Sequence, residues 1–352
     1  MKKRTFSRAL LSVVVIFGIL VFSGFISAQG MSEEAFERVK EVQEMHTQHL
    51  LQIKGVEGTA IGMNRYARPA LKVFVSKWDV AGIPGHLDGV PVQAVVSGKF
   101  YASARGGIPG KPGGDPTPDP EEQIDPTSRF DRPVPIGVST GHPDITAGTI
   151  GCRVTDGTYV YALSNNHVYA NSNIATIGDP VLQPGTYDGG SDSDDSIGTL
   201  YDFVPINFDD GENTIDAAIA LSSEDLLGNA TPPDGYGVPK SQTLPSAIGQ
   251  KVKKYGRTTG LTKGRVYAIN ATVTVNYDSD VALFVEQIVI SPGSFSEGGD
   301  SGSLIVFDGK AKTKGDDRKP IGLLFAASDL YAIANPIDAV LNALSVTIDG
   351  EQ

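Results

Sequence analysis

The stretch SEGGDSGS at residues 296–303, followed by the apolar run LIVF at 304–307, determines which fold we expect for the chain. Glycines on both sides of Ser301 allow a tight turn with φ above zero, where a side chain would clash. Consecutive N–H groups of such a turn can point at one spot and favour negative charge there. A hydroxyl alone is a poor nucleophile, so a catalytic role for Ser301 requires a base and an orienting group elsewhere. Without them the pattern is equally typical of a surface turn.

Two further segments supply candidates for these groups. The strand-like run YALSNNHV at 161–168 contains His167 near its end, and IDAAIAL at 215–221 places Asp216 at the head of a short apolar strand. The other histidines are His46, His49, His86 and His142. The first three lie near the N-terminus and the fourth precedes a proline, so His167 is the best-placed base. The alternative for His167 is a core histidine at a strand end.

The order His, Asp, Ser and these three motifs resemble the trypsin/chymotrypsin-like serine proteases, in particular the bacterial secreted branch of the α-lytic protease and streptogrisin type. The run VKKYGRTTGLTKG at 252–264 is similar to the Gly-Arg-Thr-Thr-Gly segment of that branch. The resemblance covers roughly residues 135–345. It implies an all-β fold of two six-stranded β-barrels with the catalytic cleft between them. Short strand-like runs separated by Gly, Asp and Asn after Val134 favour the same class.

The resemblance also implies the site residues. Ser301 is the nucleophile, His167 the general base, and Asp216 the group that orients the imidazole. The nearby carboxylates that match the family motif less well are Asp195, Asp202, Asp209 and Asp210. The backbone N–H groups of Gly299 and Ser301 form the oxyanion hole. Asp300 is structural, and its buried carboxylate needs a cation, for which we expect Lys254 or Arg257.

The primary pocket is the least determined part of the site. Counting back from Ser301, the resemblance places Phe295 at the base of the pocket. An extended peptide is expected to pair with a strand near Leu323–Ala326, which adds Leu324, Phe325 and Ala326 to the candidates. No acid lies at the base, which favours apolar or small residues over Lys or Arg in the substrate. Glu297 is close enough in sequence to reverse this preference if an insertion shifts the count.

Composition limits the partners. The formal charge of −12 and the pI near 4.9 argue against binding of nucleic acid or an anionic membrane. Cys152 is the single cysteine, so the chain forms no intramolecular disulfide. We expect it to be a small buried hydrophobe rather than a nucleophile. The expected partner is a polypeptide substrate, with no cofactor and no metal.

The first 28 residues predict export. A basic start, MKKR, precedes the apolar run 9–25 and several small residues, as in a signal peptide. An uncleaved membrane anchor is the alternative, because the apolar run is long. Secretion to the extracellular space or the periplasm is therefore expected.

The remaining chain divides into three parts. Residues 31–103 combine a helix at 32–54 with strands at 56–63, 70–76 and 92–96. We interpret this small α/β unit as a pro-region that acts as an intramolecular chaperone or inhibitor, or as a permanent accessory module. Residues 104–133 are a Pro/Gly-rich linker, and 134–352 form the protease domain. The acidic loop 188–195 is interpreted as solvated, with Ca²⁺ binding as the alternative.

These features predict a secreted serine endopeptidase that works through an acyl-enzyme and is made as a zymogen. The alternatives are a catalytically idle protein of the same fold that acts as an extracellular binding module, and an enzyme that cleaves only its own linker.

Overall fold

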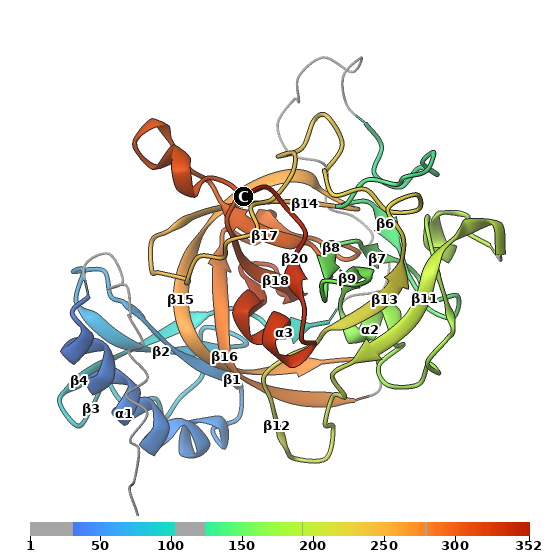
Figure 1. Ribbon diagram of the computed structural model, residues 1–352. Coiled ribbons are helices and arrows are strands. Elements are labelled where there is room, and N and C mark those ends of the chain that lie inside the picture. The colour runs from blue at the N-terminus through green and yellow to red at the C-terminus, as the bar shows by residue number, and fades with distance from the viewer. Residues whose placement is uncertain (1–30, 103–123, 192, 279) are drawn as a thin grey trace, which may run out of the picture.

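The computed structural model describes residues 31–102, 124–191, 193–278 and 280–352 (Figure 1). The expected signal peptide or anchor at 1–28 lies outside the described residues, and so does most of the expected linker. None of the helices in the described part is long and apolar enough to cross a membrane.

The described residues are mostly in strands. The helices and 3₁₀ turns are α1 (Glu33–Leu51), α2 (Asn166–Tyr169), α3 (Ile337–Ala343), η1 (Thr186–Asp188), η2 (Ser193–Asp195), η3 (Gly293–Phe295) and η4 (Ala311–Asp316). The strands that begin before residue 200 are β1 (Val56–Met63), β2 (Pro69–Val75), β3 (His86–Leu87), β4 (Val90–Val96), β5 (Phe100–Tyr101), β6 (Ser139–Thr140), β7 (Gly148–Thr149), β8 (Cys152–Thr155), β9 (Val160–Ser164), β10 (Pro180–Leu182) and β11 (Ser196–Phe203). The later strands are β12 (Glu212–Asn213), β13 (Ala218–Ser222), β14 (Lys251–Gly256), β15 (Gly260–Asn276), β16 (Val281–Ser291), β17 (Leu304–Phe307), β18 (Pro320–Ala327), β19 (Ala332–Pro336) and β20 (Thr347–Ile348).

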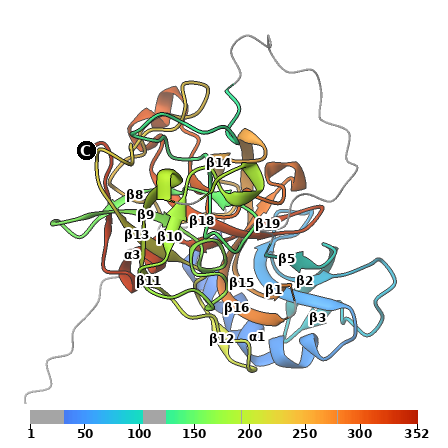
Figure 2. The same cartoon turned by 90° about the vertical axis from the view of Figure 1, so that its right-hand side faces the viewer.

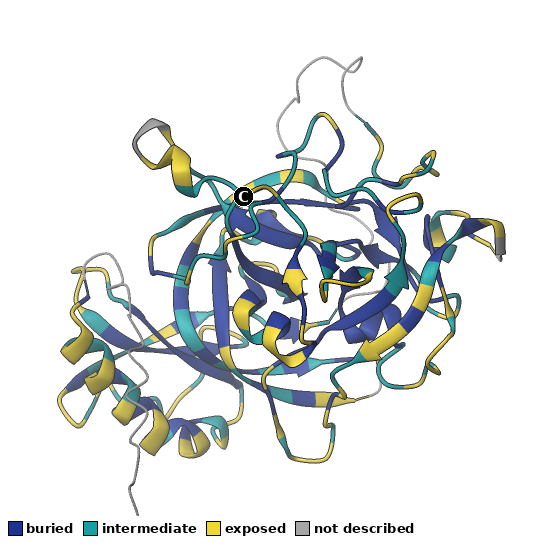
Figure 3. Cartoon of the chain, in the orientation of Figure 1, coloured by how far each residue is buried: buried dark blue, intermediate teal, exposed yellow. Residues whose placement is uncertain are grey.

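Six strands of the C-terminal half close into a ring. Hydrogen bonding runs in the order β14–β15–β16–β19–β18–β17 and returns to β14. Its buried side chains include Val252, Ile288, Ile305 and Leu324. Figure 3 shows that β17 and β18 are coloured as buried along most of their length. Because hydrogen bonding joins each of the six strands to the next around the ring, the turns between strands can carry functional groups on a rigid frame. The all-β expectation is confirmed.

The half that carries His167 contains a second sheet of six strands. Its order among the described residues is β10–β11–β13–β9–β8–β20. The apolar core of this sheet also takes in Leu304 and Leu323 from the ring and Ile337 from α3. One apolar cluster therefore spans both halves, which fixes the segments that carry His167 and Ser301 relative to each other.

The N-terminal unit begins with the expected helix. Ser32 caps α1 by accepting a hydrogen bond from the Ala35 N–H (3.2 Å), and Gly55 follows the helix with φ +96°. Val39, Val42 and Leu50 form the buried side of α1, which packs on β1 and β2. The predicted helix and the three predicted strands are all confirmed, with ends shifted by up to three residues.

The sheet of the ring continues into this N-terminal unit. β1 pairs antiparallel with β15, with Gly58 opposite Val273 and Ile61 opposite Ile269 (Figure 2). A Cβ at Gly58 would come 2.4 Å from the Thr272 carbonyl oxygen, so only glycine permits this approach. Gln43 of α1 adds two hydrogen bonds to Asn270 of β15, at 2.7 and 2.9 Å. The unit is thus joined to the ring along a hydrogen-bonded seam.

Lys72 of β2 provides a pH-dependent test of this seam. Its buried Nζ donates to Gln93 Oε1 (2.8 Å) and to Tyr267 OH of β15 (3.3 Å), and burial lowers its pKa to about 8. The amine of the unfolded chain keeps its proton to about pH 10.5, so between these two values the unfolded state binds more protons. We expect the free energy of unfolding to rise with pH across this window, relative to Lys72→Met.

Denaturant unfolding of both proteins from neutral pH upward measures this difference. Below the folded-state pKa the gap between the two free energies should be constant and should favour Lys72→Met. Parallel curves throughout would contradict the prediction.

Candidate active site

His167 and Asp216 meet inside the described fold. β9 ends at Ser164, and the short helix α2 then carries His167, while Asp216 lies two residues before the start of β13. His167 Nδ1 lies 2.6 Å from Asp216 Oδ2, and the His167 backbone N–H donates to Asp216 Oδ1 (3.2 Å). A carboxylate only accepts hydrogen bonds, so Nδ1 carries the proton and Nε2 is the basic nitrogen.

Three side chains hold Asp216 in place. Tyr277 OH donates to Asp216 Oδ2 (2.8 Å), Asn335 Oδ1 accepts from the Asp216 N–H (3.1 Å), and Asn165 Nδ2 donates to the Asp216 carbonyl (2.7 Å). Burial, followed by the charge of Asp216, raises the pKa of Tyr277 well above its usual value. The phenol therefore keeps its proton at neutral pH and remains a donor to the carboxylate.

Ser301 lies in a turn that requires glycine on both sides. Gly299 and Gly302 both have φ +95°. A Cβ at Gly299 would lie 2.6 Å from Arg257 Nη1, and one at Gly302 would lie 2.2 Å from Ser164 Oγ. Ser301 Oγ donates to the Phe325 carbonyl (3.4 Å).

The same contacts bring the serine turn to the histidine. Ser164, which packs against Gly302, ends the strand that leads into α2. The Thr149 N–H donates to the Ser301 carbonyl (2.8 Å) from the same half of the molecule as His167. His167 Nε2 is buried and makes no hydrogen bond within the described residues. An oriented imidazole with an open basic nitrogen thus lies in a segment packed against the Ser301 turn.

Asp300 is fully buried and pairs with Lys254, one of the two cations expected. Lys254 Nζ lies 3.2 Å from Asp300 Oδ2, and neither side chain is exposed. The backbone N–H groups of Glu297 and Thr258 also donate to this carboxylate, both at 2.9 Å. Burial lowers the pKa of Lys254, and the nearby Asp300 charge works against that shift. The side chain of the second candidate, Arg257, makes no hydrogen bond or ion pair with Asp300 among the described residues.

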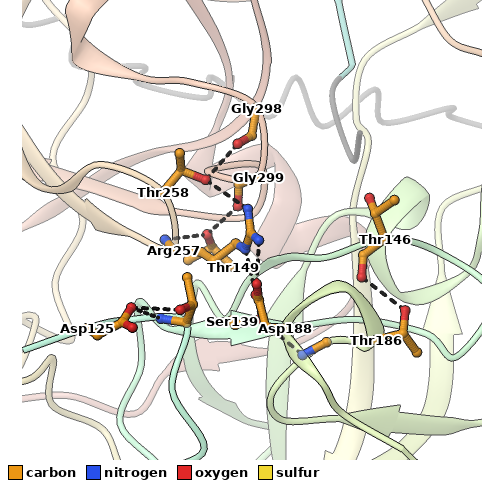
Figure 4. A network of polar contacts seen from close by, with 12 residues as sticks. Asp125, Ser139, Thr146, Thr149, Thr186, Asp188, Arg257, Thr258, Gly298 and Gly299 are labelled. Carbon is orange, nitrogen blue, oxygen red and sulfur yellow. Dashed lines mark hydrogen bonds and ion pairs between the residues drawn. The ribbon is translucent and has the colours of Figure 1, made fainter. Parts of the chain in front are cut away.

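Arg257 instead binds the acidic loop (Figure 4). Its guanidinium makes two hydrogen bonds to Asp188, at 2.7 and 2.5 Å, and both side chains are only 7% exposed. In the same loop Asp195 is buried and receives two hydrogen bonds from Arg129, at 2.7 and 2.6 Å. The interpretation of a solvated loop is therefore wrong for these two carboxylates. The described residues contain no cluster of His, Cys, Asp and Glu that could hold a metal ion.

The side chains proposed for the substrate pocket are all buried. Phe295 and Leu324 pack inside the ring, while Phe325 and Ala326 belong to the neighbouring cluster around Phe284. The backbone carbonyl of Phe325 accepts a hydrogen bond from Ser301 Oγ. The side chain of Cys152 is buried as expected, and burial raises the pKa of its thiol, so it is no candidate nucleophile.

Sequence reasoning missed the residues that position these groups. Tyr277 and Asn335 lie far from Asp216 in the chain and outside the motifs that contain His167, Asp216 and Ser301. Thr258 was visible within the Gly-Arg-Thr-Thr-Gly segment, although its contact with the serine turn was not. Thr149 gave no signal, because a threonine in a short strand is ordinary.

Comparisons with known proteins point to one class of solved structures. A family model described as the Nal1 C-terminal domain matches residues 235–331, less than a third of the chain. No curated protein matches. The chain resembles chymotrypsin-like bacterial serine proteases of known structure, at low sequence identity.

Three such structures give the extent of the likeness. A glutamic-acid-specific serine protease, which uses a histidine triad in substrate binding, is 21% identical, with a TM-score of 0.43 and coverage of 61% of this chain and 100% of its own. Thermobifida fusca protease A is 16% identical, with a TM-score of 0.43 and coverage of 62% and 98%. Cellulomonas bogoriensis chymotrypsin is 17% identical, with a TM-score of 0.42 and coverage of 63% and 100%. At these identities and TM-scores, the roles of residues in these proteases cannot be assigned to residues of this chain.

The hydrogen bond from Tyr277 to Asp216 can be weighed by substitution. Tyr277→Phe removes a donor from a buried carboxylate, which should cost about 1.5–3 kcal/mol of unfolding free energy, the range for hydrogen bonds to charged groups. Tyr169→Phe is the matched control, because Tyr169 is also buried and its hydroxyl accepts a long hydrogen bond from Thr140 (3.5 Å) rather than donating to a carboxylate. For the control we expect about 1 kcal/mol or less. Equal costs in denaturant unfolding would show that the Asp216 contact has no special weight.

Proposed function

We propose that the protein is a serine endopeptidase that acts through Ser301, His167 and Asp216. The observation that carries the proposal is the buried His167–Asp216 contact. It leaves Nε2 without a hydrogen bond within the described residues, and Ser164, which leads into the His167 segment, packs against the Ser301 turn. A buried imidazole oriented by a buried carboxylate is the arrangement that activates a hydroxyl nucleophile.

In the proposed reaction Ser301 Oγ attacks the carbonyl carbon of the scissile peptide, and its proton passes to His167 Nε2. Asp216 stabilises the imidazolium that forms, and the N–H groups of Gly299 and Ser301 stabilise the oxyanion. The imidazolium then gives its proton to the leaving amine, which departs and leaves an acyl ester on Ser301. Water, deprotonated by His167, attacks this ester and releases the acid, which restores the serine hydroxyl. No cofactor takes part.

We also propose that substrate pairs with the edge of β18 next to Ser301. β17 pairs with β18 as far as Leu323, opposite Leu304, and backbone hydrogen bonds with Gly302 and Ser303 extend this pairing to Leu324. Beyond that point the same edge continues past Phe325, whose carbonyl accepts from Ser301 Oγ. The other edge of β18 is taken by β19 up to Ala327. An extended peptide on the open edge would lie with its backbone beside the nucleophile. Small or apolar residues are proposed at the cleavage site.

The N-terminal unit is proposed to inhibit the enzyme by using this edge. Tyr101 of β5 lies antiparallel opposite Ala327, the last residue of β18. The Ala102 N–H donates to the Asn276 carbonyl (3.0 Å), and Asn276 Nδ2 donates to the Phe100 carbonyl (2.9 Å). β5 therefore covers the end of the β18 edge that is proposed to bind substrate. Export of the protein, by the segment 1–28, completes the proposal.

Labelling with a fluorophosphonate tests the catalytic proposal. We expect one label on Ser301, located by peptide mapping, and none in Ser301→Ala, because only a hydroxyl activated by a base reacts at a useful rate. If Ser301 is not labelled, even after proteolytic removal of the N-terminal unit, the proposal is overturned. A catalytically inactive binding protein is then favoured. Turnover of an unrelated protein substrate separates a general endopeptidase from one that cleaves only itself.

The inhibitory contact is tested with Tyr101→Pro, since proline lacks the N–H that a strand pair needs. Tyr101 is half exposed, so the substitution leaves the core intact. We expect Ser301 to be labelled about tenfold faster, which corresponds to a loss of about 1.4 kcal/mol from the inhibitory pairing. Trp78→Ala is the control, because Trp78 is a 90% exposed aromatic of the same unit. Equal rates in both variants would overturn the inhibitory role.

A further inference from the structure

Two threonine hydroxyls hold the peptide groups on either side of Gly299. Thr258 Oγ1 donates to the Gly298 carbonyl (2.6 Å), and Thr149 Oγ1 donates to the Gly299 carbonyl (2.9 Å) (Figure 4). In a planar trans peptide the C=O and the N–H point in opposite directions. A fixed Gly298 carbonyl therefore fixes the direction of the Gly299 N–H, one of the two donors proposed for the oxyanion.

Both hydroxyls are oriented by one residue, Arg257. Its Nη1 donates to Thr258 Oγ1 (3.2 Å), and its backbone N–H donates to Thr149 Oγ1 (3.0 Å). A hydroxyl has a single proton, so one that accepts from Arg257 directs its own proton to the carbonyl. The guanidinium also packs against Gly299 itself, where a Cβ would lie 2.6 Å from Nη1.

Asp188 fixes Arg257 in turn. The two hydrogen bonds from Nε (2.7 Å) and Nη2 (2.5 Å) form a bidentate pair, which restricts both the position and the plane of the guanidinium. Ser139 Oγ donates to Asp188 Oδ2 (2.5 Å) and restrains the carboxylate from the other side. Asp188 lies in η1, within the half of the molecule that carries His167, whereas Arg257 follows β14 of the ring.

The peptide between Gly298 and Gly299 needs such a restraint. Glycine populates positive and negative φ about equally, so two successive glycines allow this peptide to rotate at little cost. With the peptide turned over, its N–H would point away from the nucleophile. The backbone sequence alone therefore does not fix the orientation that catalysis requires.

We propose that Asp188 and Arg257 are positioning residues for the reaction, which orient the Gly298–Gly299 peptide through Thr258 and Thr149. The inference rests on the proposed peptidase function. By this proposal, the acidic loop in the His167 half helps to determine how well the Ser301 turn, in the ring half, stabilises the oxyanion. A merely structural pair would stabilise the fold without a selective effect on the transition state.

Asp188→Asn tests the proposal, with Asp195→Asn as its matched control. Both carboxylates are buried in the same loop, and each binds an arginine. Within the described residues, however, the Arg129–Asp195 pair makes no hydrogen bond to the serine turn. Oxyanion donors act in the transition state, so kcat should fall in Asp188→Asn by about tenfold or more with KM within about twofold. Complete loss of one donor lowers kcat by about 10²–10³-fold, which sets the upper limit. The control should keep its kcat while losing comparable stability in denaturant.

A second pair of variants covers the case in which Asp188→Asn does not fold. Thr258→Val removes the hydroxyl at nearly constant volume, and Thr258→Ser keeps it. We expect the fluorophosphonate labelling rate to fall several-fold with valine and to recover with serine.

The outcomes distinguish failure of the proposed peptidase function from failure of the positioning role. A wild-type protein that is not labelled overturns the proposed function. A labelled wild type, with equal kcat in Asp188→Asn and Asp195→Asn or equal labelling of the Thr258 variants, overturns the positioning role alone.

Discussion

The buried carboxylate of Asp300 is the constraint on which the serine turn depends. A charge with no exposure is tolerated only when it is paired and hydrogen-bonded, and Asp300 has Lys254 and several N–H donors around it. These partners come from β14, the segment after it and the turn itself. Because Asp300 lies between Gly299 and Ser301, satisfying its charge also fixes both neighbours. The turn is thus organised by electrostatics inside the ring together with its own glycines, which permit its positive φ angles.

The candidate site is divided between two sheets, and polar side chains cross the division. Asp216 belongs to the His167 half, yet Tyr277 and Asn335 bind it from the ring. Thr149 reaches the serine turn in the opposite direction. Each contact links groups whose own elements are held by hydrogen-bonded strands. Such crossing bonds define the mutual orientation of the two halves more sharply than the shared apolar core, because apolar packing is not directional.

The N-terminal unit is built into the molecule along a strand edge. The pairing of β1 with β15 satisfies backbone groups that would otherwise face solvent, and Gln43 and Lys72 extend the contact to side chains. Removal of the unit would expose the edge of β15 and the apolar face under β5. An exposed edge of this length invites pairing with another chain. The same seam therefore protects the ring and brings β5 to the edge proposed for substrate.

The sequence by itself determined the all-β class, the helix and strands of the N-terminal unit, and the need for glycine around Ser301, because periodicity, capping residues and glycine act over a few neighbouring residues. It also selected His167 and Asp216, which the structure brings together. Only the tertiary structure decided that Lys254 rather than Arg257 pairs with Asp300, that Asp188 is buried against Arg257, and that Tyr277 binds Asp216. These partners are separated by tens of residues along the chain. Their pairing follows from which strands close the ring and which loops meet between the halves, and no local pattern records that choice.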